Sequence, residues 1–243
     1  MTNGSRVPVI RLLVLALLVF AAPSRAQTRP PIVEEMAKAY GLDSFGQIER
    51  IRYTFNADFP GVKRSRTWVW EPKAGRVSYE GKDKAGKRVS VTYLRSQLSS
   101  QDAVVKDEID PGFVNDQYWL IFPFHQFQDS GAKVEDAGMQ KLPLGKGSAE
   151  KVVVTYPSDS GYTPGDTWTL FVGTDKRVKE FIFHRGGSVK PTVIVATWAD
   201  DKKAGPLLVS TDHRGTADGK PARFFFSDVA VMLTGSNTWV NAQ

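Results

Sequence analysis

Residues 51–59 read IRYTFNADF, and the alternation in this stretch decides the fold class. Tyr53 and Phe55 fall on one side of an extended chain, and Arg52 falls on the other. Alternation with a period of two is typical of a strand that buries one face and exposes the other. The stretch therefore predicts a half-buried strand in a sheet.

The same pattern recurs along most of the chain. Turn signals at residues 60–61, 72–75 and 81–86 separate the first runs, and Asp218-Gly219 predicts a tight hairpin between the last two. Short strands joined by short turns predict an antiparallel meander rather than βαβ crossovers. Further strands are expected at residues 68–70, 77–79, 89–93, 151–156, 167–172, 177–184, 191–198, 207–212 and 223–233.

Two segments have helical character instead. Residues 31–40 place apolar side chains on one helical stripe, with Pro31 at the first position and Gly41 at the end. Residues 113–124, FVNDQYWLIFPF, predict a short helix that opens near Asn115 or Asp116 and is ended by Pro123. This second helix is apolar on nearly every side, so it must lie against another part of the protein.

Together these elements predict a mainly β protein of the α+β type. Its expected form is a single, strongly curved antiparallel sheet, an unclosed half-barrel, with an N-terminal helix and a short helical lid. No linker or shift in composition divides residues 27–243, so one domain is expected.

The first 26 residues have the features of a secretory signal peptide. Arg6 and Arg11 precede an apolar run at residues 12–22, and small residues at 24 and 26 predict cleavage after Ala26. The run of about 11 residues is shorter than the roughly 20 that span a bilayer. We expect a periplasmic or secreted bacterial protein with no transmembrane span after cleavage.

Charge and cysteine content narrow the function classes. The chain has 32 Lys and Arg against 26 Asp and Glu, but three of the arginines lie within residues 1–26. The remainder is a scattered surface charge, which argues against nucleic acid as a partner. The chain has no cysteine, which excludes disulfides, thiolate metal sites, a cysteine nucleophile and a lipidated N-terminal cysteine.

The sequence offers little support for catalysis. His125, His184 and His213 are not spaced as a metal site requires. The carboxylates at 107, 108 and 110, and those at 200 and 201, lie in stretches expected to be solvated turns. We expect no catalytic residue, metal or cofactor; a hydrolase with His125 or a loop carboxylate as base is the weakest alternative.

The aromatic side chains are the positive signal. The chain has 27 of them, and several share one face of the expected sheet. One interpretation is a filled core, and the other is an apolar cavity enclosed by the curved sheet. The predicted lining of that cavity is Tyr53, Phe55, Trp68, Trp70 and Tyr93, with Tyr118, Trp119 and Phe122 on the lid.

The order of these segments resembles the LolA-like superfamily of periplasmic lipoprotein carriers. FVNDQYWLIFPF at 113–124, followed by GYTPGDTWTLFV at 161–172, is similar to an uncharacterised subgroup of secreted bacterial proteins with that fold. The resemblance implies an incomplete antiparallel barrel with an apolar lining and a helical lid, and it assigns no catalytic residue. It implies a monomeric carrier or binder of lipid, lipoprotein acyl chains or another apolar ligand, with an outer-membrane or envelope protein as a possible partner. The alternative is an envelope interaction or structural module with a filled core.

Overall fold

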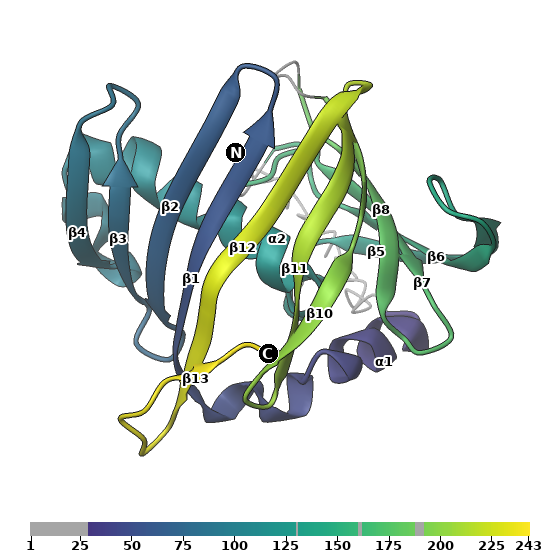
Figure 1. Cartoon of the computed structure of the whole chain (residues 1–243), viewed down its shortest axis with the longest axis horizontal. Helices are drawn as coiled ribbons and strands as arrows, with labels where there is room; N and C mark the ends of the chain where they lie inside the picture. Colours follow the sequence, from purple (N-terminus) through teal and green to yellow (C-terminus); the bar gives the residue numbers. More distant parts are fainter. Residues whose placement is uncertain (1–28, 130, 160–161, 188–191) are drawn as a thin grey trace, which may run out of the picture.

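The computed structural model describes residues 29–129, 131–159, 162–187 and 192–243. The strands of this described part form one antiparallel sheet of 13 strands in the order β4-β3-β2-β1-β12-β11-β9-β8-β7-β6-β5, with β10 on β11 and β13 on β12 (Figure 1). The outer strands of this order, β4 and β5, do not pair with each other, so the sheet is open. The prediction of a mainly β, unclosed and curved antiparallel sheet is confirmed.

The bounds of the elements are as follows. The helical segments are α1 (Pro31–Ala39), η1 (Leu42–Gln47), η2 (Arg95–Ser100), η3 (Val105–Ile109) and α2 (Asp110–Gln128). The strands are β1 (Ile48–Phe59), β2 (Val62–Glu71), β3 (Arg76–Lys82), β4 (Arg88–Leu94), β5 (Lys133–Lys141), β6 (Ser148–Thr155), β7 (Thr167–Val172), β8 (Val178–His184), β9 (Val193–Thr197), β10 (Ala199–Ala204), β11 (Leu207–Ala217), β12 (Lys220–Leu233) and β13 (Val240–Asn241).

Strand β1 and its C-terminal partner β12 form the centre of the sheet. Along β1 the side chains alternate between buried and half-exposed, as its sequence predicts. Phe55 pairs with Phe226 across the strands, so the first and last long strands of the chain lie side by side. The predicted hairpin at Asp218-Gly219 joins β11 to β12, and both residues have positive φ. This pairing joins the N-terminal meander to the C-terminal strands in one sheet.

Helix α1 agrees with its prediction. Ile32, Val33 and Met36 are buried on one stripe, and Lys38 pairs with Glu34 one turn earlier at 2.6 Å. Gly41 ends the segment with a φ of 100°, and a Cβ there would lie 2.5 Å from the Pro206 carbonyl oxygen. The close approach and the left-handed backbone both require glycine at this position.

Helix α2 differs from its prediction. It begins at Asp110, five or six residues before the expected start, and continues past Pro123 to Gln128. Proline lacks the N–H that would bond to the carbonyl of residue 119, and the backbone kinks at Ile121 (φ −128°, ψ 27°). The freed Trp119 carbonyl instead lies 3.1 Å from Nε2 of the buried His213. A side chain from β11 thus provides a hydrogen-bond partner for the helix carbonyl that the proline leaves unpaired.

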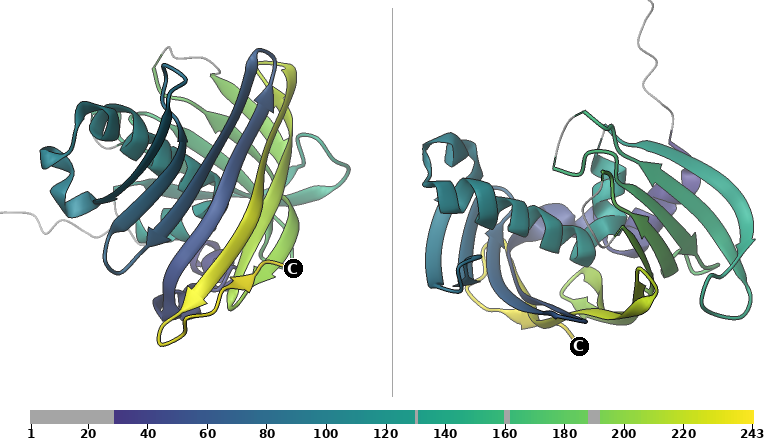
Figure 2. Two further views of the ribbon diagram at one scale, coloured as in Figure 1. Left: turned by 60° about the vertical axis from the view of Figure 1, so that its left-hand side comes forward. Right: turned by 90° about the horizontal axis from the view of Figure 1, so that it is seen from above.

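The position of α2 also differs from that of a short lid. It runs inside the curve of the sheet, with strands below it and on both sides (Figure 2). Its side chains are buried around most of its circumference, including Phe113, Leu120 and Phe124. The helix is therefore the centre of the hydrophobic core, and the expectation that it lies against another part of the protein is confirmed.

Strands β5 and β10 and the two-residue strand β13 have no counterpart in the predictions. Strand β5, with the sequence KVEDAGMQK, is exposed along nearly its whole length, and β10 carries the sequence ADDKKA. Their alternation is absent because an edge strand has little face to bury, and backbone pairing with a neighbour forms them instead. Asp200 and Asp201, expected in a solvated turn, lie in β10.

The predicted signal peptide lies outside the described residues, which begin at 29. Among the helices that the structure describes, none is long and apolar enough to cross a membrane.

Candidate ligand-binding site

The eight predicted lining and lid residues lie on the concave face and on α2, but they do not surround one common space. Tyr53, Phe55, Trp68 and Tyr93 are buried on the sheet, and Trp70 is half-buried. Trp68 and Trp70 both meet Phe113 of α2, with ring centroids 5.6 and 5.8 Å apart. This half of the predicted lining is packed against the helix.

The lid residues pack against the other half of the sheet. Trp119 stacks on Phe224 at 5.0 Å with an angle of 4° between the ring planes, and Phe122 stacks on Trp168 at 4.1 Å. Tyr118 is half-buried and stacks on His125 at 4.3 Å. Most of the concave face is therefore filled by α2 and its aromatic contacts.

Two buried carboxylates hold α2 to the sheet, and sequence reasoning found neither role. Asp116 has no exposed surface; it accepts hydrogen bonds from Arg66 Nε at 2.7 Å and from Trp68 Nε1 at 2.8 Å. Burial raises the pKa of Asp116, and the positive charge of Arg66 opposes that rise. The pair links the middle of α2 to strand β2.

Asp110 makes the second link, at the start of α2. The sequence places it in a solvated turn, but it is fully buried. It accepts hydrogen bonds from Tyr93 at 3.0 Å, from Arg95 at 2.9 Å and from Tyr162 at 2.5 Å. Burial raises the pKa of Tyr93, and the adjacent Asp110 raises it further. The expectation failed because tertiary contacts bring three donors to this carboxylate.

The three histidines occupy different environments. His213 lies between the carbonyl oxygens of Trp119 and Thr197, and burial lowers its pKa to about 4. Burial also lowers the pKa of His125 to about 4, whereas His184 is exposed at the end of β8. Within the described ranges no three His, Asp or Glu side chains gather as metal ligands would.

An open space does exist at one end of the concave face. Strand β2 pairs with β3 only from Thr67↔Glu80 to Glu71↔Arg76. Beyond Thr67, β2 pairs with β1 alone, and the end of β3 pairs with β4 alone. The sheet splits here, and the split contains a cleft of about 1080 Å³.

The inner wall of the cleft joins the aromatic layer. Trp68 and Tyr79 face each other across β2 and β3 with ring centroids 4.6 Å apart, and Ile109 and Val89 contribute further apolar surface. The Tyr79 ring passes over Gly81, where a Cβ would lie 2.3 Å from its hydroxyl oxygen, and that hydroxyl donates to the Lys82 carbonyl at 2.8 Å. Of the eight predicted residues, Trp68 is the one that lines the cleft.

Two arginines at the cleft were missed by sequence reasoning. Arg64 and Arg66 lie on the same face of β2 as Trp68, because side chains two apart on a strand point the same way. Cations at inward-facing positions of a strand are unusual and indicate a buried partner or a ligand. The alternation of residues 64–70 contained that signal, but nothing in the sequence paired Arg66 with Asp116.

Comparison with known proteins yields likeness of fold alone. No known family of sequences matches the chain, and no curated protein matches it. A DUF1329 family protein from Desulfovibrio piger is similar in structure, with 9% identity, a TM-score of 0.43 and coverage of 83% of this chain and 93% of that one. The lipoprotein LppX of Mycobacterium tuberculosis has 11% identity, a TM-score of 0.30 and coverage of 83% and 96%. A chain of the Pseudomonas aeruginosa MucA/MucB complex has 12% identity, a TM-score of 0.25 and coverage of 85% and 57%.

The arrangement of the elements agrees with the layout that the sequence resemblance implied. An open, curved antiparallel sheet encloses helical structure on its concave side, and a helix precedes the first strand (Figures 1 and 2).

Proposed function

We propose that this protein is a non-enzymatic carrier or binder of an apolar ligand, such as a lipid or a lipoprotein acyl chain, in the bacterial periplasm. The observation that supports the proposal is the cleft of about 1080 Å³ that opens between β2 and β3 onto the buried aromatic layer at Trp68 and Tyr79. Ligand sites are commonly concave, largely apolar and a few hundred to a thousand Å³ in volume.

The filled part of the concave face defines where the ligand would lie. Buried aromatic stacking and the carboxylates Asp110 and Asp116 hold α2 in place, so a ligand under the whole helix would have to displace it. The cleft requires no such movement. An apolar chain entering there contacts Trp68, Tyr79 and Ile109, and burial of its surface is favourable by about 25 cal/mol per Å². The deeper lining residues Tyr53, Phe55, Trp70 and Tyr93, and the lid residues Tyr118, Trp119 and Phe122, remain predictions for a ligand that extends beneath α2.

A single substitution tests the proposal. Val89 and Val91 lie on the same face of β4, and Val89 lines the cleft whereas Val91 does not. Val89→Trp should narrow the cleft and reduce uptake of dodecanoic acid by stripped protein, as measured by native mass spectrometry. Val91→Trp, the same change one position further along the same face, should leave uptake unchanged. Wild-type protein that takes up no lipid or fatty acid after gentle purification or added ligand would overturn the proposed function.

The competing function is an envelope interaction module that uses the sheet as a packed scaffold. It predicts that neither tryptophan variant alters ligand uptake, because no ligand is taken up. The same measurement therefore separates the two functions.

A further inference from the structure

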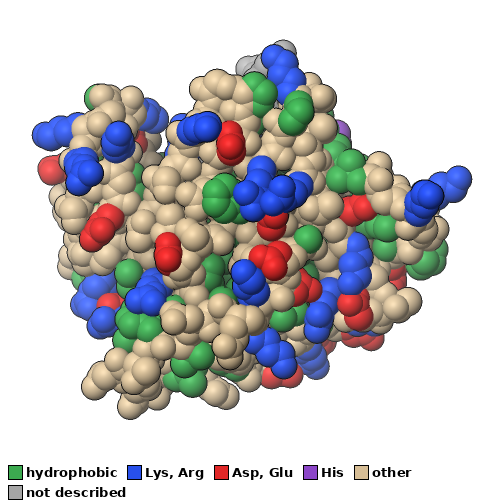
Figure 3. Space-filling view, viewed as in Figure 1, with side chains coloured by type: hydrophobic (Ala, Val, Ile, Leu, Met, Phe, Trp, Pro, Cys, Tyr) green, Lys and Arg blue, Asp and Glu red, His purple; other side chains and the backbone are tan. Residues whose placement is uncertain are grey.

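The charges around the cleft determine what kind of apolar molecule it can accept. Six basic side chains line it: Lys63, Arg64, Arg66, Lys82, Lys84 and Arg88. Figure 3, which views the convex side of the sheet, shows basic side chains near the tips of the β1–β2 and β3–β4 hairpins, with acidic side chains among them.

The acidic side chains of the cleft do not neutralise its inner wall. Glu108 accepts a hydrogen bond from the Lys84 backbone N–H at 2.8 Å, and Asp83 accepts one from the Lys87 backbone N–H at 2.8 Å. Asp58 and Glu80 are on the convex face of their strands, opposite in direction to Ala57 and Tyr79. Neither carboxylate points toward the aromatic wall.

On that inner wall Arg66 pairs with a buried carboxylate, and Arg64 does not. Asp116 binds Arg66 directly through Nε and the terminal nitrogen, and it is fully buried. Arg64 makes no hydrogen bond or ion pair with any residue that the structure describes. Burial lowers the pKa of Arg64, and the positive charge of Arg66 lowers it further. An anion placed beside Arg64 would relieve this repulsion.

We infer that the cleft selects an anionic amphiphile, whose phosphate or carboxylate headgroup binds Arg64 while its alkyl chain lies on Trp68, Tyr79 and Ile109. The inference rests on the proposed function and adds the headgroup class to it. Guanidinium groups bind phosphate and carboxylate with paired, charge-assisted hydrogen bonds. Lys63, Lys82 and Arg88 line the outer part of the cleft on the same convex face as Asp58 and Glu80, so the selection rests on Arg64, which lies on the concave side.

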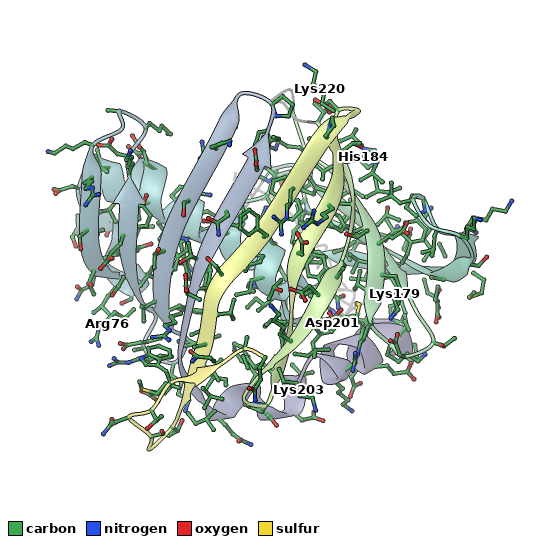
Figure 4. The ribbon with its side chains drawn as sticks, in the orientation of Figure 1. Arg76, Lys179, His184, Asp201, Lys203 and Lys220 are labelled. Atoms are coloured by element: carbon green, nitrogen blue, oxygen red, sulfur yellow. The ribbon has the colours of Figure 1, made fainter. Side chains whose placement is uncertain are left out.

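Arg64 is an informative residue to change because its side chain is exposed and makes no hydrogen bond or ion pair with a described residue. Arg64→Gln removes the charge and Arg64→Glu reverses it, without opening a cavity in the core. Lys203→Gln and Lys203→Glu are the matched controls. Lys203 is also exposed, and Figure 4 places it at the end of the sheet opposite Lys220 and the hairpin tips.

Calorimetric titration with three probes, each below its micelle concentration, tests the inference. The probes are dodecyl phosphate, the neutral 1-monododecanoylglycerol and inorganic phosphate. We expect dodecyl phosphate to bind at least about tenfold more tightly than the neutral lipid, since one charge-assisted bond is worth a tenfold change or more. Arg64→Gln should remove that preference, Arg64→Glu should invert it, and the Lys203 variants should keep it.

Three outcomes would overturn the inference, and they are distinguishable. Equal binding of the charged and neutral lipids, unchanged in the Arg64 variants, refutes the headgroup selection and leaves the proposed function standing. Inorganic phosphate bound as tightly as dodecyl phosphate shows a free-anion site and refutes the amphiphile. Binding of neither lipid refutes the proposed function together with this inference.

Discussion

The buried pair between Arg66 and Asp116 permits a sharp test of how α2 is held. The carboxylate has no exposed surface, and the Arg66 side chain is 13% exposed. Asp116→Ala leaves a largely buried guanidinium without its anion and leaves Trp68 Nε1 without its acceptor at 2.8 Å. Breaking a buried ion pair from one side costs about 3–5 kcal/mol. We expect the free energy of unfolding to fall by that amount.

Asp116→Asn should cost less than Asp116→Ala, because the amide oxygen can still accept from Trp68. Urea denaturation followed by tryptophan fluorescence measures both variants, and Trp68 is itself a reporter at the site. For a domain of this size each kcal/mol corresponds to about 2–4 °C in Tm, so Asp116→Ala should lower Tm by roughly 6–20 °C.

The control is an exposed pair that also joins one acidic and one basic side chain. Glu135 and Lys133 form an ion pair on β5 with side chains 55% and 60% exposed, and exposed pairs contribute at most about 1 kcal/mol. Glu135→Ala should therefore change stability little. If Asp116→Ala is no more destabilising than Glu135→Ala, the carboxylate does not hold α2 and the account of the core is wrong.

Two further predictions concern the stability of the protein at acidic pH and the effect of a side chain at Gly81. His125 and His213 have pKa values of about 4 in the fold, below the 6.5 of an unperturbed histidine, so the unfolded chain binds protons first as the pH falls. The free energy of unfolding should decrease between pH 6.5 and 4 by at most about 3 kcal/mol per histidine. Urea denaturation midpoints measured across that pH range should decline less in His213→Gln than in the wild-type protein. If the midpoints of the double variant His125→Gln/His213→Gln decline as much as those of the wild type, the two histidines do not cause the loss of stability. Gly81→Ala places a Cβ against the Tyr79 ring and should lower Tm and disturb the cleft wall. Gly46→Ala is the control and should leave Tm unchanged, because no atom lies within 4 Å of a Cβ at that position. Equal Tm values for the two variants, measured by differential scanning calorimetry, would show that Tyr79 is not held over Gly81.

The local sequence pattern was sufficient to predict a helix or strand wherever that element buries one face. The alternation in residues 51–59 predicted β1, and the stripe of residues 31–40 predicted α1. Both follow from short-range geometry, since side-chain direction repeats every two residues in a strand and every 3.6 in a helix. Strand β5 carried no such pattern, because its polar side chains face solvent and pairing with β6 alone forms it.

The candidate site followed from the sequence only in part. Trp68 was predicted to line a ligand site because it shares a face with other aromatic residues; it lies on the wall of the cleft, and its contact with a ligand stays a prediction. The cleft itself depends on where the pairing of β2 with β3 stops, at Thr67↔Glu80. The register and extent of this pairing depend on both strands and on the turn between them, so the sequence of one strand does not predict where the pairing stops.

The sequence by itself determined the fold class, the aromatic face and helix α1, and it indicated that residues 113–124 are helical, because each depends on neighbours a few residues apart. The tertiary structure decided that α2 fills the concave face and that Pro123 is tolerated through His213. It also decided that, among the described residues, Arg66 has an ionic partner and Arg64 has none. These outcomes depend on residues 50 to 94 positions apart in the chain meeting in a buried environment. There, an unpaired charge or carbonyl is costly, and only the folded arrangement determines which partner satisfies it.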